Sequence, residues 1–376
     1  MPSEINNIHI IFMDQQLFDI VSRFQVEGTV SEIRPLGEGL INDTYKVTTS
    51  EPDAPDYVLQ HVNTAVFPDV DMVMNNIRAV TTHIRRKFLA EGVADIDRRV
   101  LRFLPLKDNN EKLYTLDAEG RPWRLMVFIA GAITKQAVNP ESSEAAGEAF
   151  GQFQAMLADI PETLGETIKD FHNMEFRLKQ LMEAIAENKS GRIEDTKPII
   201  DELLPYSEEM TQAERLGREG KLPKRICHCD TKVNNMMFDE HDRVLCVIDL
   251  DTVMPNYIFS DYGDFLRTAA NFTAEDDANL FRVGFNMDIF QAFTKGYLRS
   301  ASSFITPLEK ELLPYAATLF PYMQSVRFLW DFLNGDLYWK CRYPEHNLDR
   351  ARNQLMLFKS AYAKKQEMAD FIKSLG

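Results

Sequence analysis

The periodicity of apolar residues changes near residue 130, and this change constrains the fold more than any other feature of the chain. Before it, short segments alternate apolar and polar side chains with a period of two, which is typical of β-strands. After it, apolar residues recur every three to four positions, as on one face of a helix. We therefore expect an α+β protein with a small β-rich lobe, residues 1–130, and a larger helical lobe, residues 131–376.

The pattern also predicts individual elements. The first lobe is expected to hold one helix, from Val70 to Phe88, and strands at 30–34, 43–49, 57–62, 100–104, 112–116 and 124–129. The turn-rich segment 117–122 is expected to join the last two strands as a hairpin. Helices are expected in the second lobe at 140–157, 173–188, 197–218, 259–271, 276–299, 307–338 and 348–373, around a strand-rich island at 225–250.

The charge balance excludes several kinds of partner. The chain has 57 acidic and 42 basic residues, for a formal net charge of −15. Nucleic acids and anionic membrane surfaces attract basic faces, so neither is an expected partner. No apolar run approaches the roughly 20 residues that span a bilayer, and residues 1–7 lack the features of a signal peptide. We therefore expect a cytoplasmic protein.

The cysteines do not indicate a disulfide or metal framework. There are four of them in 376 residues, too few for a scaffold held by disulfides. Cys227 and Cys229 flank His228, but this spacing is not that of a tetrahedral zinc site. We expect reduced, partly buried thiols.

The most informative segment is His228–Asn235, which contains the pattern His-x-Asp-x-Lys-x-x-Asn. Two short apolar strands follow it, around a turn at 239–243, and the second ends at Asp249-Leu250-Asp251. A hairpin of this kind brings Asn235 and Asp249 to the same end. Carboxylate and amide oxygens are ligands that Mg²⁺ prefers.

This arrangement suits phosphoryl transfer, which needs an oriented acceptor hydroxyl and divalent metal on the phosphates. Asp230 is the expected base that orients the hydroxyl, and Lys232 the expected cation that balances charge on the moving phosphoryl group. Asn235 and Asp249 are the expected metal ligands. Asp251 lies on the same side as Asp249 if the strand continues, and is expected to hold a second metal ion. His228 is expected to brace the loop.

Simpler interpretations exist for each residue taken alone. A pair such as Asp249 and Asp251 is more often a solvated strand end, and Asn235 is more often a turn residue. The combination with a hairpin between them favours catalysis.

A phosphate-binding loop is expected in the first lobe if this interpretation holds. Gly37 and Gly39 lie between the first two strands, where glycines let backbone N–H groups approach anionic oxygens. Most Gly-x-Gly pairs are plain hairpin turns. Segment 126–129, with Val127 and Ile129, is placed where backbone groups would bind adenine.

The chain resembles the aminoglycoside phosphotransferase and choline kinase superfamily, and within it the N-acetylhexosamine 1-kinases. The resemblance rests on segments 39–45, 228–235, 247–255, 261–264, 327–336 and 346–352. It implies a bilobal protein-kinase-like fold, ATP, Mg²⁺ and an amino-sugar acceptor phosphorylated at its anomeric oxygen. It also implies nucleotide contacts from Asn42 and Thr44, and acceptor contacts from Arg327 and Tyr338, besides Asp230.

The chain departs from kinases at one point. Kinases place a Lys on the third strand, paired with a Glu on the following helix, but segment 57–62 contains no Lys and segment 70–88 contains no Glu. The candidates to replace this pair are Gln60, His61, Arg78, Arg85 and Arg86.

Two alternatives to the sugar kinase stay open. The acceptor can be another small molecule, such as an aminoglycoside or choline. Because the Lys is missing, a second alternative is a pseudokinase, which binds nucleotide without turnover. The oligomeric state is not predicted.

Overall fold

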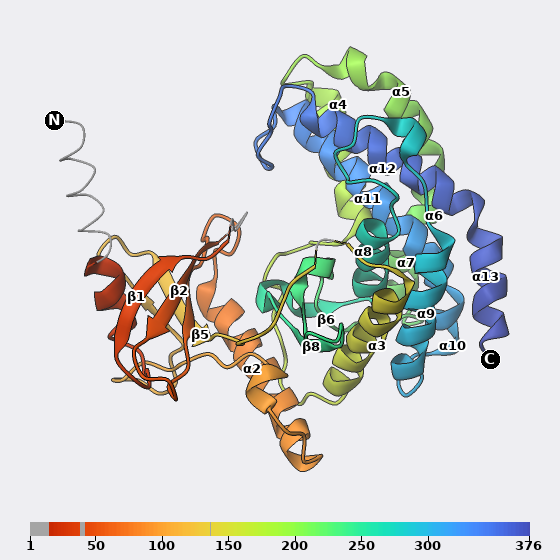
Figure 1. Cartoon of the computed structure of the whole chain (residues 1–376). Helices are drawn as coiled ribbons and strands as arrows, with labels where there is room; N and C mark the ends of the chain where they lie inside the picture. Colours follow the sequence, from red (N-terminus) through yellow and green to blue (C-terminus); the bar gives the residue numbers. More distant parts are fainter. Residues whose placement is uncertain (1–14, 38–41, 136) are drawn as a thin grey trace. The chain divides into compact units, whose positions relative to one another are not determined.

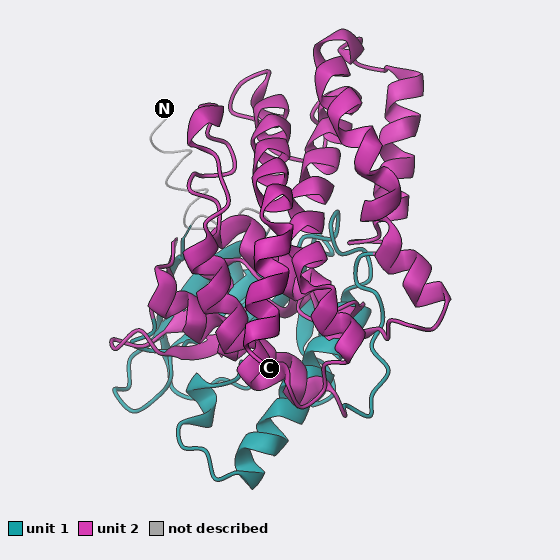
Figure 2. Ribbon diagram, turned by 90° about the vertical axis from the view of Figure 1, so that its right-hand side faces the viewer, with its two compact units in different colours: residues 1–132, 160–168 teal, residues 133–159, 169–376 magenta. Residues whose placement is uncertain are grey.

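The structure is a computed structural model that describes residues 15–37, 42–135 and 137–376 (Figure 1). The chain forms two compact units (Figure 2). The first comprises Met1–Ala132 and Ile160–Ile168, and the second Ile133–Asp159 and Lys169–Gly376. The sequence pattern did not indicate that 160–168 belongs to the first unit. The Asn76 side chain holds it there, because it donates to the Gly165 carbonyl at 2.8 Å and accepts from the Gly165 N–H at 3.1 Å.

The first unit is built on a five-stranded antiparallel sheet in the order β1-β2-β3-β5-β4. The elements are β1 (Val30–Pro35), β2 (Asp43–Thr49), β3 (Tyr57–His61), α2 (Val70–Ala90), β4 (Tyr114–Leu116) and β5 (Pro122–Val127). The alternating apolar residues form one core around Val47, Leu59 and Leu125, which are fully buried. The predicted β4–β5 hairpin is confirmed, and Asp117 accepts the N–H groups of Glu119 and Arg121 within its turn.

The predicted strand at 100–104 is wrong. Within the described chain it contributes a single bridge, between Phe103 and Met126, whose two bonds run from the Leu104 N–H to the Leu125 carbonyl at 2.8 Å and from the Val127 N–H to the Arg102 carbonyl at 2.9 Å. β4 already pairs with Pro122–Arg124 on this edge of β5, so only the end of β5 is left for it. A short helical stretch at 15–21 was also missed.

The second unit is mainly helical. Its helices are α3 (Pro140–Leu157), α4 (Met174–Glu187), α5 (Ile193–Leu203), α6 (Ser207–Met210), α7 (Gln212–Arg218), α8 (Phe259–Ala269), α9 (Met287–Ala301), α10 (Pro307–Glu311), α11 (Leu313–Asn334), α12 (His346–Ala363) and α13 (Lys365–Ser374). α3 and α9 pack closely because glycines line their contact. A Cβ at Gly147 would lie 2.1 Å from the Phe293 carbonyl oxygen, and one at Gly296 would lie 1.9 Å from that of Glu144.

Four predicted helices differ from those in the structure. The segments 197–218, 307–338 and 348–373 are each divided into shorter helices, and α9 begins at Met287 rather than 276. Asn286 caps α9, since its side chain accepts the N–H of Asp288 at 3.0 Å. Before it, Asp276 pairs with Arg342 and His346 instead of starting a helix. α11 ends at Gly335, whose φ of 92° requires glycine-like freedom.

The strand-rich island is confirmed as two antiparallel pairs. β6 (Arg225–Cys227) pairs with β9 (Met254–Asn256), and β7 (Met236–Phe238) pairs with β8 (Val244–Val247). The segment His228–Asn235 connects β6 to β7. No helix in the described ranges is both long and apolar enough to cross a membrane.

Candidate active site

The loop after β6 is fixed by a buried carboxylate from α8. The two oxygens of Asp261 accept the N–H groups of His228 at 3.0 Å and Cys229 at 2.8 Å. Gln154 of α3 donates to the same carboxylate at 2.7 Å. Cys229 has a φ of 63°, in the left-handed region. A backbone turned this way needs firm support, and Asp261, which is 0% exposed, supplies it.

His228 joins this loop to the end of β8. Its Nε2 lies 2.8 Å from the carbonyl oxygen of Ile248, which can only accept, so Nε2 carries the proton. Nδ1 is then free to accept the N–H of Asp230 at 3.2 Å. Thr252 adds a bond to the His228 carbonyl at 2.7 Å. The histidine therefore positions residues on both sides of it.

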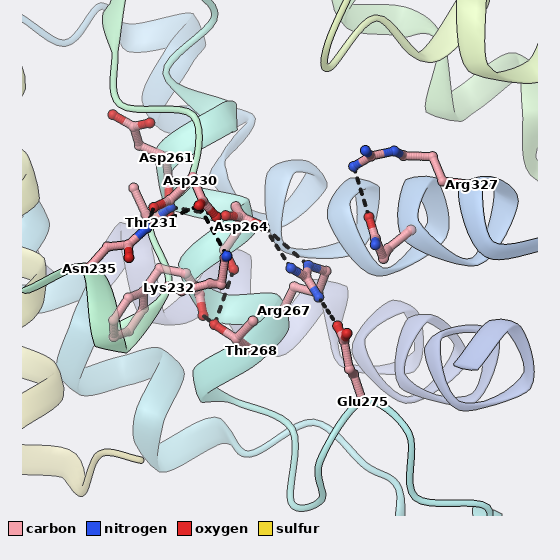
Figure 3. Close-up of polar contacts among 12 residues, drawn as sticks. Asp230, Thr231, Lys232, Asn235, Asp261, Asp264, Arg267, Thr268, Glu275 and Arg327 are labelled. Atoms are coloured by element: carbon pink, nitrogen blue, oxygen red, sulfur yellow. Dashed lines mark hydrogen bonds and ion pairs between the residues drawn. The ribbon is translucent and has the colours of Figure 1, made fainter. Parts of the chain in front are cut away.

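Asp230, Lys232 and Asn235 meet at one carboxylate oxygen (Figure 3). Oδ2 of Asp230 lies 3.0 Å from Nδ2 of Asn235 and 3.1 Å from Nζ of Lys232. The nearby Asp230 carboxylate raises the pKa of Lys232, which stays protonated. Both contacts use Oδ2, so Oδ1 is left for another donor. Asn235 also donates to the Asp230 carbonyl at 2.8 Å, so its own side-chain oxygen faces elsewhere.

Asp249 lies beside this group. The Ile248 N–H donates to the Asn235 carbonyl at 2.9 Å, which brings position 249 next to Asn235. The Asp249 side chain is exposed, and its φ of 61° is left-handed. The surrounding protein partly displaces water from this carboxylate and so raises its pKa to about 6. The negative charges of Asp251 and Asp230 add to the shift. A carboxylate in this situation favours a bound cation.

Asp251 does not lie as expected. The prediction assumed that the strand continues past Asp249, but β8 ends at Val247 and Leu250–Thr252 form a 3₁₀ turn. Asp251 is 1% exposed, in contrast to Asp249.

The donors present fit Mg²⁺. In the described ranges, no three His, Cys, Asp or Glu side chains gather as a metal cluster of their own. The side-chain oxygens of Asn235 and Asp249 form a mixed amide and carboxylate set, and Mg²⁺ needs few protein ligands because it keeps several waters.

In the first unit, the side chains of Asn42 and Thr44 accept hydrogen bonds around β2 and β3. Asn42 is buried and accepts the Asn63 N–H at 3.0 Å, and Thr44 accepts from Gln60 at 3.1 Å. Gly37 has a φ of 71° and open space where a Cβ would stand. Gly39 lies outside the described residues.

The predicted adenine-binding segment has its backbone groups partly occupied. The Val127 N–H donates to the Arg102 carbonyl at 2.9 Å, and the Ile129 carbonyl accepts from Ala132 at 3.4 Å. Both side chains are buried.

Arg124 was not among the candidates to replace the missing Lys, yet it lies beside the expected position. It comes from β5, opposite Gln60 of β3. Its Nη2 and Nε donate to the Gln60 side-chain oxygen at 2.9 and 3.1 Å, and it is only 2% exposed. The signal was a charged residue in an otherwise apolar strand, which places an ion in the interior of the first unit.

A comparison with protein families identifies the chain. Residues 32–297, which carry all the elements from β1 to most of α9, match the model of the phosphotransferase enzyme family. The chain belongs to this phosphotransferase family.

Solved structures show the same fold. An aminoglycoside phosphotransferase from Alicyclobacillus acidocaldarius matches at 14% identity with a TM-score of 0.58, over 95% of this chain and 94% of its own. An amicoumacin kinase, solved with AMP-PNP, Ca²⁺ and Ami, matches at 13% identity with a TM-score of 0.58, over 93% and 95%. A choline kinase from Cryptosporidium parvum matches at 14% identity with a TM-score of 0.53, over 92% and 91%. The predicted α+β kinase-like fold is confirmed.

Within the second unit of this phosphotransferase, Arg327 lies on α11 and Tyr338 on the loop after it. Arg327 is 9% exposed, whereas Tyr338 is 49% exposed. Burial lowers the pKa of Arg327, and the more distant charges of Asp264 and Asp230 partly offset this shift.

Sequence reasoning missed the residues that hold the loop. Asp261 was noted only as part of the family resemblance, and so was Asp264, which accepts the Thr231 N–H at 3.0 Å and pairs with Arg267 at 3.1 Å (Figure 3). The available signal was a pair of carboxylates three residues apart on a helix that is otherwise buried.

Proposed function

We propose that this phosphotransferase is an ATP-dependent kinase of a small hydroxylated acceptor, with Asp230 as the catalytic base. The observation that carries the proposal is the arrangement at Asp230, whose Oδ2 is held by Asn235 and Lys232 while Oδ1 remains open. The proposed co-substrate is ATP, and the amicoumacin kinase structure with AMP-PNP supports it.

In the proposed reaction, Oδ1 of Asp230 accepts a hydrogen bond from the acceptor hydroxyl and aligns it with the γ-phosphorus. A new bond forms between the acceptor oxygen and phosphorus, and the bond from phosphorus to the β,γ-bridging oxygen breaks. ADP leaves with that electron pair, and the hydroxyl proton passes late to Asp230 and then to solvent. Lys232 offsets negative charge beside the reacting groups.

Mg²⁺ would be held by the side-chain oxygens of Asn235 and Asp249 and would supply charge neutralisation on the phosphates. Asp251 is proposed to support this site from its buried position. Gly37, Gly39, Asn42, Thr44, Gln60, Val127 and Ile129 are the proposed nucleotide-binding positions.

The proposed acceptor is an N-acetylhexosamine, phosphorylated on its anomeric hydroxyl, with Arg327 and Tyr338 in contact with the sugar. This part of the proposal rests on the resemblance of segments such as 327–336 and 346–352. The alternative is another small acceptor, since the solved relatives include an aminoglycoside phosphotransferase and a choline kinase.

A screen with product analysis tests the function. ATP consumption is measured with N-acetylglucosamine, N-acetylgalactosamine, aminoglycosides and choline, with and without Mg²⁺, and NMR locates the phosphate. We expect turnover that depends on an acceptor and on Mg²⁺. Thermal stabilisation by ATP without turnover on any acceptor would instead support a pseudokinase.

Asp249→Asn is expected to lower kcat by at least about 100-fold and to raise the Mg²⁺ concentration needed for half-maximal rate, because a metal ligand loses its charge. Folding should be unaffected, since Asp249 is exposed and asparagine accepts its left-handed φ of 61°. Titration of the rate with Mg²⁺ measures the effect.

Asp242→Asn is the matched control. Asp242 is also an exposed aspartate with a φ of 61°, at the opposite end of the same hairpin. An unchanged Mg²⁺ requirement in Asp249→Asn, or an equal change in Asp242→Asn, would exclude Asp249 as a ligand.

A further inference from the structure

A buried carboxylate lies at the end of α11, where a helix disfavours negative charge. Asp331 is in the last turn of this helix and is 0% exposed. The carbonyl groups at a helix C-terminus carry partial negative charge, so they repel an acidic side chain. Burial adds a second cost, because a carboxylate that leaves water must find hydrogen-bond donors within the protein. An arrangement that is costly in two ways indicates a role beyond the stability of the helix.

The donors to Asp331 come mainly from the loop that follows α11. Its Oδ1 accepts the N–H groups of Leu337 at 3.0 Å and Tyr338 at 2.8 Å. Its Oδ2 accepts the N–H of Trp339 at 3.1 Å and the side-chain amide of Asn347 at 2.9 Å. Three consecutive backbone N–H groups therefore converge on one carboxylate.

The chain reverses sharply to bring residues 337–339, which we call the anchored segment, back to this carboxylate. Gly335 and Asp336 both have a left-handed φ, of 92° and 60°. A residue other than glycine keeps such a backbone only where its surroundings hold it. The Asp336 carboxylate is held from two other helices, because it accepts from Asn347 of α12 at 2.9 Å and pairs with Arg192, just before α5.

The anchored segment carries two aromatic rings with different surroundings. The rings of Tyr338 and Trp339 lie edge to face, with centroids 4.6 Å apart. Trp339 packs on Phe328 of α11 at 4.7 Å between centroids, whereas Tyr338 is 49% exposed. One ring is thus fixed on the protein, and the other is accessible to a ligand in an orientation that the anchored backbone sets.

We infer that Asp331 is a positioning residue for the acceptor, and that it acts through the backbone of the anchored segment without touching the acceptor. This inference rests on the proposed function, in which Tyr338 contacts the acceptor. Fixing the backbone of a residue costs conformational entropy. Because folding has already fixed the anchored segment, acceptor binding does not have to order it, and the affinity for the acceptor is higher.

Asp331→Asn tests the inference, because an amide keeps the shape of the side chain but offers one acceptor oxygen instead of two. Two of the four donors that meet at this position then lose their acceptor. We expect the KM for the acceptor to rise about 10- to 30-fold while kcat changes less than about threefold, since an interaction made equally in the bound state and the transition state affects KM alone. The KM for ATP should stay unchanged.

Hydrogen exchange followed by mass spectrometry measures the order of the anchored segment directly. In Asp331→Asn we expect peptides that span residues 337–339 to exchange at least about 10-fold faster than in the wild type. A purely structural role would lower the stability of the protein without separating the KM for the acceptor from kcat and from the KM for ATP.

Gly335→Ala is an independent variant of the same loop. Beyond the neighbouring residues, its Cβ would meet no described atom within 4 Å, but alanine resists the left-handed φ of 92° that the reversal requires. This variant should also raise the KM for the acceptor, by a smaller factor than Asp331→Asn, with kcat and the KM for ATP preserved.

Phe290→Leu is the control for a general loss of stability. Phe290 is fully buried where α9 meets α13, with its ring centroid 6.2 Å from that of Phe371. The variant should lower Tm and leave both the exchange of residues 337–339 and the KM for the acceptor as in the wild type.

An acceptor KM within about twofold of the wild-type value in folded Asp331→Asn would overturn the inference, whatever the exchange rate of the anchored segment. If Asp331→Asn does not fold, an unchanged acceptor KM in Gly335→Ala overturns it instead. Turnover of an acceptor with such an unchanged KM refutes the inference and leaves the kinase function intact. Absence of turnover with every acceptor would refute both.

Discussion

We expect the replacement of Asp230 by asparagine to lower kcat by roughly 10³-fold. This is the largest effect that we predict on activity. Asparagine keeps the shape of the side chain but cannot accept the acceptor's proton, and loss of a positioned base typically costs 10²- to 10⁴-fold. It also removes the charge that Nζ of Lys232 approaches at 3.1 Å. Steady-state kinetics with the best acceptor of the screen measures the effect.

The KM for ATP should change little in Asp230→Asn, because the carboxylate acts on the acceptor. Asp288→Asn, an exposed aspartate in the first turn of α9, is the control and should keep full activity. If Asp230→Asn retained more than a tenth of the wild-type kcat, Asp230 would not be the base.

Replacement of Asp261 by alanine is expected to lower the free energy of unfolding by about 3–5 kcal/mol, the largest effect that we predict on stability. The change leaves the buried N–H groups of His228 and Cys229 and the amide of Gln154 without their acceptor. Each unsatisfied buried donor costs about 1–3 kcal/mol. Urea unfolding followed by circular dichroism measures the change.

Asp261→Asn should lose less stability than Asp261→Ala, because the amide oxygen can still accept from one side. Asp370→Ala serves as the control, because Asp370 is an exposed aspartate on the terminal helix α13. The loss of unfolding free energy there should stay below about 0.5 kcal/mol. A loss below about 1 kcal/mol in Asp261→Ala would mean that other contacts hold the catalytic loop.

Much of the first unit could be predicted from the sequence, because its strands are short, alternate with period two and are separated by turn residues. β1, β2, β3 and α2 lie within two residues of their predicted bounds. The strand at 100–104 failed because local alternation cannot show that β4 already occupies part of the same edge of β5.

The long helices were harder to delimit. Helical periodicity runs through 276–286, yet α9 begins only at Met287. The acidic residue Asp276 is taken instead by Arg342 and His346 from about 70 positions away. Pairing over such a distance leaves no trace in a local pattern.

For the candidate site, the sequence by itself determined the residues of the Asp230 loop and the hairpin that follows it, because turn chemistry and alternation act over a few residues. Only the tertiary structure decided what holds the loop and what surrounds the acceptor. Asp261 lies more than 30 positions beyond His228, and Arg327 lies against Phe171, more than 150 positions before it. The partner of a buried charge is selected by the packing of distant elements, because a charge that is buried away from water without a partner is costly.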